Sequence, residues 1–583
     1  MSTASKIGAW LHLTRLFLRQ FLENDLVSPD SDRAQLIAVV GAGIVSLTLF
    51  LSMFLSAAYA MSVLTPGEAA VRTLNDKFFY VSLAMLITAL VAASQWDALS
   101  LDQRDAAILD PLPVPPSIVR WAKLTAVAML GAAVAIAVNV FPTWVFPWML
   151  SFSVRQMPVT DVFWLMAIHF MVTVTAAVFG YLVVMALRET LCAVLGPKLF
   201  TRLSPTFQAT TIVVLGSLTL LVPPASTRVS ERAFQGTWAE LPPVAFVAMY
   251  EVASRGFLND LPRRLVTERM ARRDRANSQI YEQLRPQFLP LARRLEVLLG
   301  GAAAILIAAT VVNGFRAPVG GVLLTASGRR RSRIPERSVN AVVVRSPAAR
   351  AGFHFAIATL FRSKTHRLTL AAAAAVGLAM IMFVLSRIEL TPGRLTPGIL
   401  VVQPLLYGCL LVAFRHLIRV PAELRANWGV RLAWRDNPRA FKEGVTRAAL
   451  LALAMPAVAI VIPLVAWIAG IETALAHAAL GMLGAAIVVE SLMLGYDKAP
   501  FTCNYVPGGA KALVPILVLA FFVGANIFAR IELWTLDGSN VVRNVVLLLA
   551  IYGGLRIASM LRRDPLVDFD EGPETFNQLG LHT

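Results

Sequence analysis

Long apolar runs without charged residues dominate this chain of 583 residues. The first extends from Ala34 to Thr65 and contains no Asp, Glu, Lys, Arg or His. A helix that crosses the hydrocarbon core of a bilayer needs only about 20 apolar residues, so this run is long enough to span a membrane. Hydrophobic residues make up 57% of the chain and charged residues only 15%, which excludes an ordinary soluble protein of this length. The sequence predicts an all-α, polytopic membrane protein.

Twelve charge-poor runs predict about 12 transmembrane helices in two six-helix halves. Twelve crossings place both termini on the same side of the membrane. The expected crossings of the first half lie near residues 34–61, 78–96, 124–147, 162–187, 208–222 and 297–315, and those of the second half near 368–386, 398–414, 448–469, 474–494, 512–529 and 541–558.

Clusters of Lys and Arg at alternate ends of these runs indicate the orientation, because cytoplasmic loops carry an excess of basic residues. Segments 316–367 and 415–447 are strongly basic, so we expect both in the cytoplasm, together with the two termini. The net charge of +18 arises largely from such loops. We therefore interpret it as a topology signal and expect the lipid bilayer, and no nucleic acid, as its partner.

The charge pattern also divides the chain into domains. The segment 223–296 is long and of mixed charge, and we expect it to be an external, partly helical subdomain in which 244–250 dips back toward the bilayer. The full division is an interfacial amphipathic helix at 1–33, a first six-helix half at 34–315, a basic linker and connecting helix at 316–367, a second half at 368–558 and an acidic cytoplasmic tail at 559–583.

Motifs for catalysis or nucleotide binding are missing from the sequence. It contains no G-x-x-x-x-G-K-[ST] phosphate loop, no H-E-x-x-H motif and no G-x-S-x-G elbow. We therefore expect no enzymatic activity, no cofactor and no metal site in this chain. Of the three cysteines, we expect Cys192 and Cys503 in cytoplasmic loops and Cys409 within a crossing, which disfavours a disulfide.

Several stretches carry a resemblance to a known class. Residues 96–114 resemble the cytoplasmic loop of ABC-2-type exporter permeases, where a charged helix followed by Leu-Pro-Val leads to Lys123 and the third crossing. Residues 354–367, 421–431, 500–508 and 564–581 look like stretches of one uncharacterised family of bacterial permease-like proteins of that class. Ala245 departs from the pattern, because relatives tend to carry Trp there.

The resemblance implies a bacterial inner-membrane protein with an interfacial connecting helix, a coupling helix between the second and third crossings, and small external helices between the fifth and sixth. It also implies a separate ABC ATPase subunit as partner. We expect that ATPase to contact two cytoplasmic segments, within 97–123 and 415–447. The residues expected to couple to it are Asp102, Arg104, Asp105 and Asp110 in the first half and Glu423, Arg425, Asn427 and Trp428 in the second.

Glu490 is a charged residue inside the tenth expected crossing, where an unpaired charge is costly. It could line a transport pathway or gate, or it could pair with Arg415, Arg419 or Lys498 near the cytoplasmic end, and we favour pairing. His169, Asn139 and Asn526 also lie within expected crossings, and we expect them to form interhelical hydrogen bonds rather than bind ligands.

The leading functional hypothesis is a permease subunit of an ATP-driven exporter that works with a separate ATPase. One alternative is a non-transporting membrane scaffold or regulator that binds a partner through the basic loops. A weaker alternative is an ion-driven secondary transporter, which would need several buried carboxylates, whereas Glu490 is nearly alone in the sequence. The apolar residues of the expected crossings do not indicate which substrate is transported.

Overall fold

The structure is a computed structural model. It describes part of the chain, namely residues 3–22, 48–50, 52–53, 56–57, 59, 61–96, 109, 111, 114–154, 157–226, 234, 236–262, 267–316, 346–386, 388, 391–421, 437–496, 498–502, 514–538 and 541–561. Every regular element within these ranges is helical. The chain forms two compact units, residues 1–328 and 329–583, and each is described by itself.

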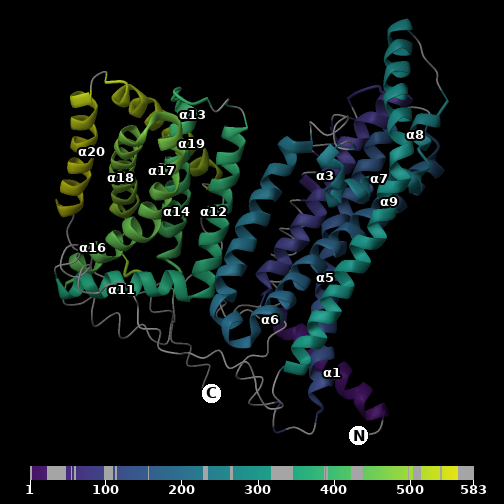
Figure 1. Ribbon diagram of the computed structural model, residues 1–583, viewed down its shortest axis with the longest axis horizontal. Helices are drawn as coiled ribbons and strands as arrows, with labels where there is room; N and C mark the ends of the chain where they lie inside the picture. Colours follow the sequence, from purple (N-terminus) through teal and green to yellow (C-terminus); the bar gives the residue numbers. More distant parts are fainter. Residues whose placement is uncertain are drawn as a thin grey trace, which may run out of the picture. The chain divides into compact units, whose positions relative to one another are not determined.

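The first unit is a bundle of long helices with short ones packed into its side (Figure 1). Its largest apolar core joins α3, α5, α6, α7 and α9. The helices are α1 (Thr3–Leu22), α3 (Pro66–Ser94), α5 (Pro116–Ser153), α6 (Val159–Ser226), α7 (Pro242–Ser254), α8 (Phe257–Asp260) and α9 (Glu268–Arg316), with a 3-10 turn at Gly236–Glu240.

Helix α1 is amphipathic, as the spacing of its apolar residues predicts. Leu13 and Phe17 are buried against a face of α5 that includes Ala122. Leu11 and Leu16 remain exposed on α1. The helix therefore has a second apolar surface that is free to contact lipid, in accord with an interfacial position.

Helix α3 begins at a capping box and is held against α9. The Thr65 side chain accepts from the backbone N–H of Glu68, and the Thr65 backbone N–H donates to the Glu68 carboxylate at 3.2 Å. One residue earlier in the helix, the Gly67 N–H donates to Oδ1 of Asp274 at 2.8 Å. A Cβ on Gly67 would overlap with Ser278 of α9, so glycine is needed for this close approach.

Helix α6 comprises two arms that meet at Gly196. Its 68 residues would extend far beyond the roughly 30 Å of a bilayer core if they formed one straight helix. Gly196 has φ 72° and ψ 164°, which is not a helical conformation, and Figure 1 shows the chain bending sharply in α6. This break lies within the loop that the sequence predicted between the fourth and fifth crossings.

Both arms of α6 pack on α3 through small or polar residues. In the first arm, the Ala177 carbonyl accepts from the Thr88 hydroxyl at 2.7 Å, and Gly180 lies directly against the Met85 carbonyl. In the second arm, Ser204 accepts from the indole N–H of Trp96, just beyond the end of α3, at 2.9 Å. Such interfaces are typical of helices that associate in a membrane.

The second unit is also a helical bundle, and α11 runs across the base of its upright helices (Figure 1). Its core joins α11, α12, α14, α16, α17 and α18. The helices are α11 (Pro347–Arg362), α12 (Lys364–Leu385), α13 (Pro397–Leu400), α14 (Val402–Leu417), α16 (Pro438–Ala449), α17 (Met455–Ala469), α18 (Ile471–Leu494), α19 (Val514–Leu536) and α20 (Val541–Leu561), and a π-helical turn (Leu450–Ala454) joins α16 to α17.

The crossing of α11 and α16 has a glycine on each helix. A Cβ on Gly352 would overlap with the Phe441 carbonyl, and a Cβ on Gly444 would overlap with the Ala349 carbonyl. The two backbones therefore approach closely, while Phe353 and Phe441 are buried beside them. The expected connecting helix is thus a structural part of the second unit.

Nine helical segments among the described residues are long and apolar enough to cross a membrane. They are α3, α5, α6, α9, α12, α13–α14, α16–α17, α18 and α20. Each overlaps one or, for α6, two of the expected crossings. The first expected crossing, 34–61, falls largely outside the described residues. The protein is accordingly an all-helical, multi-pass membrane protein.

Candidate functional site

The residues expected to couple to an ATPase lie outside the described part of the chain. This holds for Asp102, Arg104, Asp105 and Asp110 and for Glu423, Arg425, Asn427 and Trp428. Lys123, at the end of the first expected segment, is described. It lies in α5 and is buried, with its Nζ 5.1 Å from the centre of the Phe17 ring of α1.

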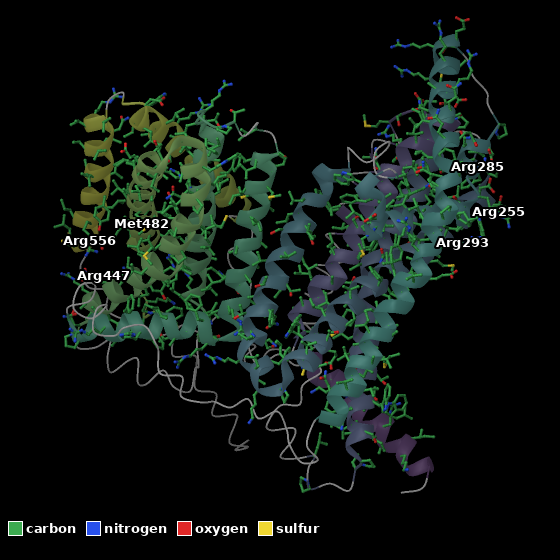
Figure 2. The ribbon with its side chains drawn as sticks, viewed as in Figure 1. Arg255, Arg285, Arg293, Arg447, Met482 and Arg556 are labelled. Carbon is green, nitrogen blue, oxygen red and sulfur yellow. The ribbon has the colours of Figure 1, made fainter. Side chains whose placement is uncertain are left out.

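Glu490 is paired, and its partner is Arg556 of α20, not one of the three basic residues expected from the sequence. The Arg556 guanidinium donates to Glu490 Oε1 at 2.9 Å and to Glu443 Oε1 of α16 at 2.7 Å. Arg447 donates to the same Glu443 oxygen at 2.6 Å. This network ties together α16, α18 and α20, and Figure 2 shows Arg447 and Arg556 in the same part of the second unit.

Arg415, one of the expected partners of Glu490, has other contacts. Its Nε donates to the Leu492 carbonyl at 2.7 Å, and its guanidinium lies 4.6 Å from the centre of the Tyr496 ring. Arg415 therefore joins α14 to the end of α18. The interpretation of Glu490 as a paired carboxylate agrees with this structure, with a different partner.

A buried ion pair lies in the first unit, between Lys77 of α3 and Glu251 of α7. Both side chains are nearly inaccessible, at 1% and 3% exposed. The other carboxylate oxygen of Glu251 accepts from the Tyr281 hydroxyl of α9 at 2.6 Å. Lys77 Nζ also lies 4.7 Å from the centre of the Tyr250 ring. One carboxylate thus connects three helices.

Local backbone geometry sets the position of Glu251 and Tyr281. Helix α7 starts at two prolines and ends at Ser254. The next two residues, Arg255 and Gly256, have left-handed φ values of 56° and 66°. A Cβ on Gly256 would lie 3.0 Å from the Tyr281 hydroxyl. The turn from α7 to α8 can therefore pass close to α9 because residue 256 is glycine.

An aromatic layer surrounds His169 next to this ion pair. The rings of Tyr80 and Phe146 are each 5.3 Å from the His169 ring, centre to centre. The Tyr250 hydroxyl lies 3.4 Å from His169 Nδ1. Burial raises the pKa of Tyr250 well above its ordinary value, so the hydroxyl keeps its proton and can donate to His169. His169 thus makes the interhelical hydrogen bond that the sequence predicted.

The asparagines expected to bond between helices bond within their own helices. The Asn139 amide donates to the Ala135 carbonyl at 2.7 Å, and the Asn526 amide donates to the Phe522 carbonyl at 2.8 Å. Both partners lie four residues earlier, where the helix itself leaves a carbonyl within reach of a short polar side chain.

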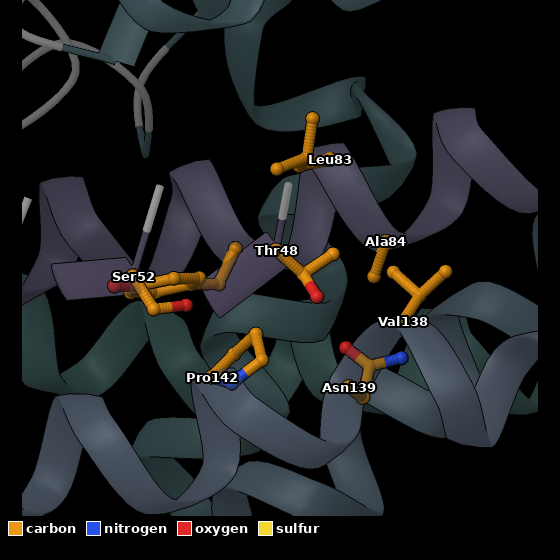
Figure 3. Close-up of a pocket in the computed structure, with 8 residues that line it drawn as sticks. Thr48, Ser52, Leu83, Ala84, Val138, Asn139 and Pro142 are labelled. Atoms are coloured by element: carbon orange, nitrogen blue, oxygen red, sulfur yellow. The ribbon is translucent and has the colours of Figure 1, made fainter. Parts of the chain in front are cut away.

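Asn139 also lines a small cavity in the first unit (Figure 3). Its volume of about 10 Å³ is space for one water molecule. Figure 3 shows Pro142 and Asn139 facing Thr48 and Ser52 across it. The cavity is lined by Thr48, Ser52, Tyr80, Leu83, Ala84, Val138, Asn139 and Pro142. It is too small for a transported solute and has room for one water molecule at most.

A buried histidine–carboxylate pair lies in the second unit. His477 Nδ1 of α18 is 2.6 Å from Glu532 Oε1 of α19, and each side chain is 1% exposed. From the sequence we expect Glu532 in the connection that follows the eleventh crossing, but α19 continues to Leu536. Glu532 is thus a second buried carboxylate on a long helix of this unit, besides Glu490. Within the described residues, no group of three or more His, Cys, Asp or Glu could hold a metal ion.

Comparisons with known proteins return no neighbours: no protein-family model matches the chain, and neither the curated proteins nor the solved structures contain a significant match.

Proposed function

We propose that this chain is the transmembrane permease subunit of an ATP-driven exporter of the ABC-2 class and works with a separate ATPase. The observation that carries the proposal is the position of α7 and α8 between the second arm of α6 and α9. The resemblance implies small external helices at this place, between the fifth and sixth crossings. The lack of a phosphate loop in the sequence is a reason to assign ATP hydrolysis to another polypeptide.

A topology of twelve crossings fits this proposal. The nine segments become ten when the arms of α6 are counted separately at Gly196. Helix α19 and the apolar run 34–61 bring the number to twelve. With the basic loops in the cytoplasm, both termini lie there too, in the inner membrane of a bacterial cell.

The two units share one feature of their arrangement: an amphipathic helix precedes the crossings of each. Helix α1 precedes the first crossings of unit 1, and α11 precedes those of unit 2. Each buries one apolar face, through Phe17 in α1 and Phe353 in α11. A helix packed at the cytoplasmic face is suited to transmit movement from a soluble ATPase to the helical bundle.

The test is co-purification of an ATPase from the native membrane with the intact chain. The charge-reversed variant Asp105→Lys/Arg425→Glu should lose that ATPase while still inserting and folding. Glu472→Lys is the matched control, because Glu472 is exposed at the start of α18, on the side proposed to be external. Equal recovery with all variants would refute the coupling assignment, and absence of any ATPase would favour the scaffold or regulator.

Ion-driven transport is a second candidate, because the structure shows buried charges on the long helices or packed against them. Glu532 in α19 and the Lys77–Glu251 pair are nearly inaccessible, and such groups commonly mark ion pathways in membranes. Purified protein in vesicles would then drive solute flux from a pH or sodium gradient without ATP. Flux that needs the ATPase and ATP would favour the exporter instead.

A further inference from the structure

Three helices of the second unit meet at a polar junction. Helix α18 contributes His477 and two glycines, Gly481 and Gly484, which lie one and two turns after the histidine on the same side. Helix α14 faces these glycines: a Cβ on Gly481 would overlap with the amide of Gln403, and one on Gly484 would lie 2.7 Å from the Tyr407 hydroxyl. Helix α19 completes the junction with Glu532, bonded to His477.

Several polar atoms at this junction have no hydrogen-bond partner within the described residues. They are both amide atoms of Gln403, Nε2 of His477 and Oε2 of Glu532. All three residues are buried, with a whole-residue exposure of 0% for Gln403 and His477 and 2% for Glu532. Buried polar groups are normally hydrogen-bonded. This concentration of unpaired donors and acceptors therefore indicates a site that binds water or protons.

The charges at the junction are also unbalanced when His477 is neutral. Glu532 then contributes a negative charge, and no Lys or Arg side chain bonds to it in the described residues. The 2.6 Å separation between Nδ1 and Oε1 matches a charge-assisted hydrogen bond, in which one proton lies between imidazole and carboxylate. A second proton, on Nε2 of His477, would make the pair neutral overall.

We propose that His477 and Glu532 form a proton-binding site within the membrane-crossing helices of the second unit. On uptake, one proton leaves water and binds the imidazole of His477, so that neutral imidazole and carboxylate become imidazolium and carboxylate. Release returns the proton to water. Gln403 and Tyr407 form the polar wall opposite the pair, where water can bridge the site to Nε2. The site is defined by its own proton exchange and does not depend on the proposed exporter function.

Few other titratable groups surround the pair. Tyr407 of α14 lies within electrostatic range of Glu532. Helices α13 and α17 contain no titratable residue, and Glu472 of α18 and Arg530 of α19 are exposed. On α20, Asn544 donates to Thr535 of α19 at 3.0 Å, and Arg543 lies beside Asn544. His477 and Glu532 are therefore the main ionisable groups of the junction.

The experiment is nitrogen NMR of the full chain in detergent, with nitrogen-labelled histidine. The chain has seven histidines, and the signal missing from His477→Gln identifies His477. We expect this signal to show a transition as the pH is lowered, when Nε2 of the imidazole takes up a proton. In Glu532→Gln the same transition should move to lower pH, because the carboxylate that stabilises imidazolium is gone.

Glu490→Gln is the matched control, since Glu490 is a buried carboxylate of α18 whose partner is Arg556. It should leave the His477 transition in place. A potentiometric pH jump provides a second measurement: Glu532→Gln and His477→Gln should each take up about one proton fewer than the wild type, and Glu490→Gln should not. Either variant suffices if the other fails to fold. A His477 signal that is constant with pH, or equal proton uptake by all proteins, would overturn the proposal.

Discussion

Lys77 and Glu251 are separated by 174 residues in the sequence, yet they form an ion pair that is almost completely buried. The pair joins a membrane-crossing helix, α3, to the short helix α7, which is inserted into the side of the first unit. Tyr281 of α9 binds the same carboxylate. The segment between α6 and α9 is therefore anchored inside the bundle by charge as well as by its apolar residues.

Replacing Lys77 by methionine should destabilise the first unit. The substitution leaves the Glu251 carboxylate buried with only the Tyr281 hydroxyl as partner, and removal of one member of a buried pair typically costs about 3–5 kcal/mol. Thermal unfolding of the purified protein in detergent would measure the loss. The double variant Lys77→Met/Glu251→Leu should recover part of it, because no charge is then left unpaired.

Arg272→Met is the control for that measurement. Arg272 bonds to Glu268 at 3.2 Å, but both side chains are largely exposed, at 74% and 88%. Solvent screens such a pair, so its loss should hardly change the unfolding temperature. If Lys77→Met were no more harmful than Arg272→Met, the buried pair would not anchor α7.

The crossing of α11 and α16 should not tolerate a larger residue at Gly444. Gly444→Ala places a methyl group against the Ala349 carbonyl, and overpacking of this kind typically costs about 1–3 kcal/mol. Gly553→Ala in α20 is the control, because a Cβ there meets nothing within 4 Å. Proteolysis within 317–346 of both variants would measure whether α11 loosens. Equal cleavage of both proteins would show that close packing at Gly444 does not hold α11.

The membrane-crossing helices could be located from the sequence because burial in lipid imposes a local rule. Each crossing needs its own run of apolar residues, and helices α12, α18 and α20 begin and end within a few residues of the expected crossings. The same rule failed at Glu532. Arg530 and Glu532 end the charge-poor run, so the sequence predicted a loop, but α19 continues past them because His477 satisfies the carboxylate.

Pairings between distant residues could not be found in the same way. No periodicity connects Lys77 with Glu251, or Glu490 with Arg556, since these contacts depend on how helices pack. The available signal was a charged residue close to an apolar run: Lys77 directly precedes the expected second crossing. Expecting a buried partner for that lysine would have directed attention to the carboxylates of 223–296.

Glu490 and Arg556 should show energetic coupling in a double-mutant cycle. Glu490→Gln and Arg556→Gln each break the 2.9 Å bond between α18 and α20, so the double variant should lose less than the sum of the single losses. Contacting residues of this kind typically couple by about 0.5–3 kcal/mol. The exposed pair Arg285–Glu282, at 3.1 Å, is the control cycle and should be nearly additive. Additivity at both sites would mean that the Glu490 bond contributes nothing to stability.

The orientation of the chain can be tested at two positions on opposite sides of the sixth crossing. Arg272 lies on the polar, exposed part of α9, and Ser332 lies in the basic segment that follows the same helix. A single cysteine at each position, in a chain whose three native cysteines are replaced, is treated with a membrane-impermeant maleimide. In intact spheroplasts, the reagent should label the Arg272→Cys protein only, because the positive-inside rule places Ser332 in the cytoplasm. Inverted vesicles should give the opposite result. Labelling of Ser332→Cys alone in spheroplasts would show that the orientation is the opposite of the proposed one. Helices α7 and α8 would then lie on the cytoplasmic side, and the basic loops would not be accessible to a cytoplasmic ATPase.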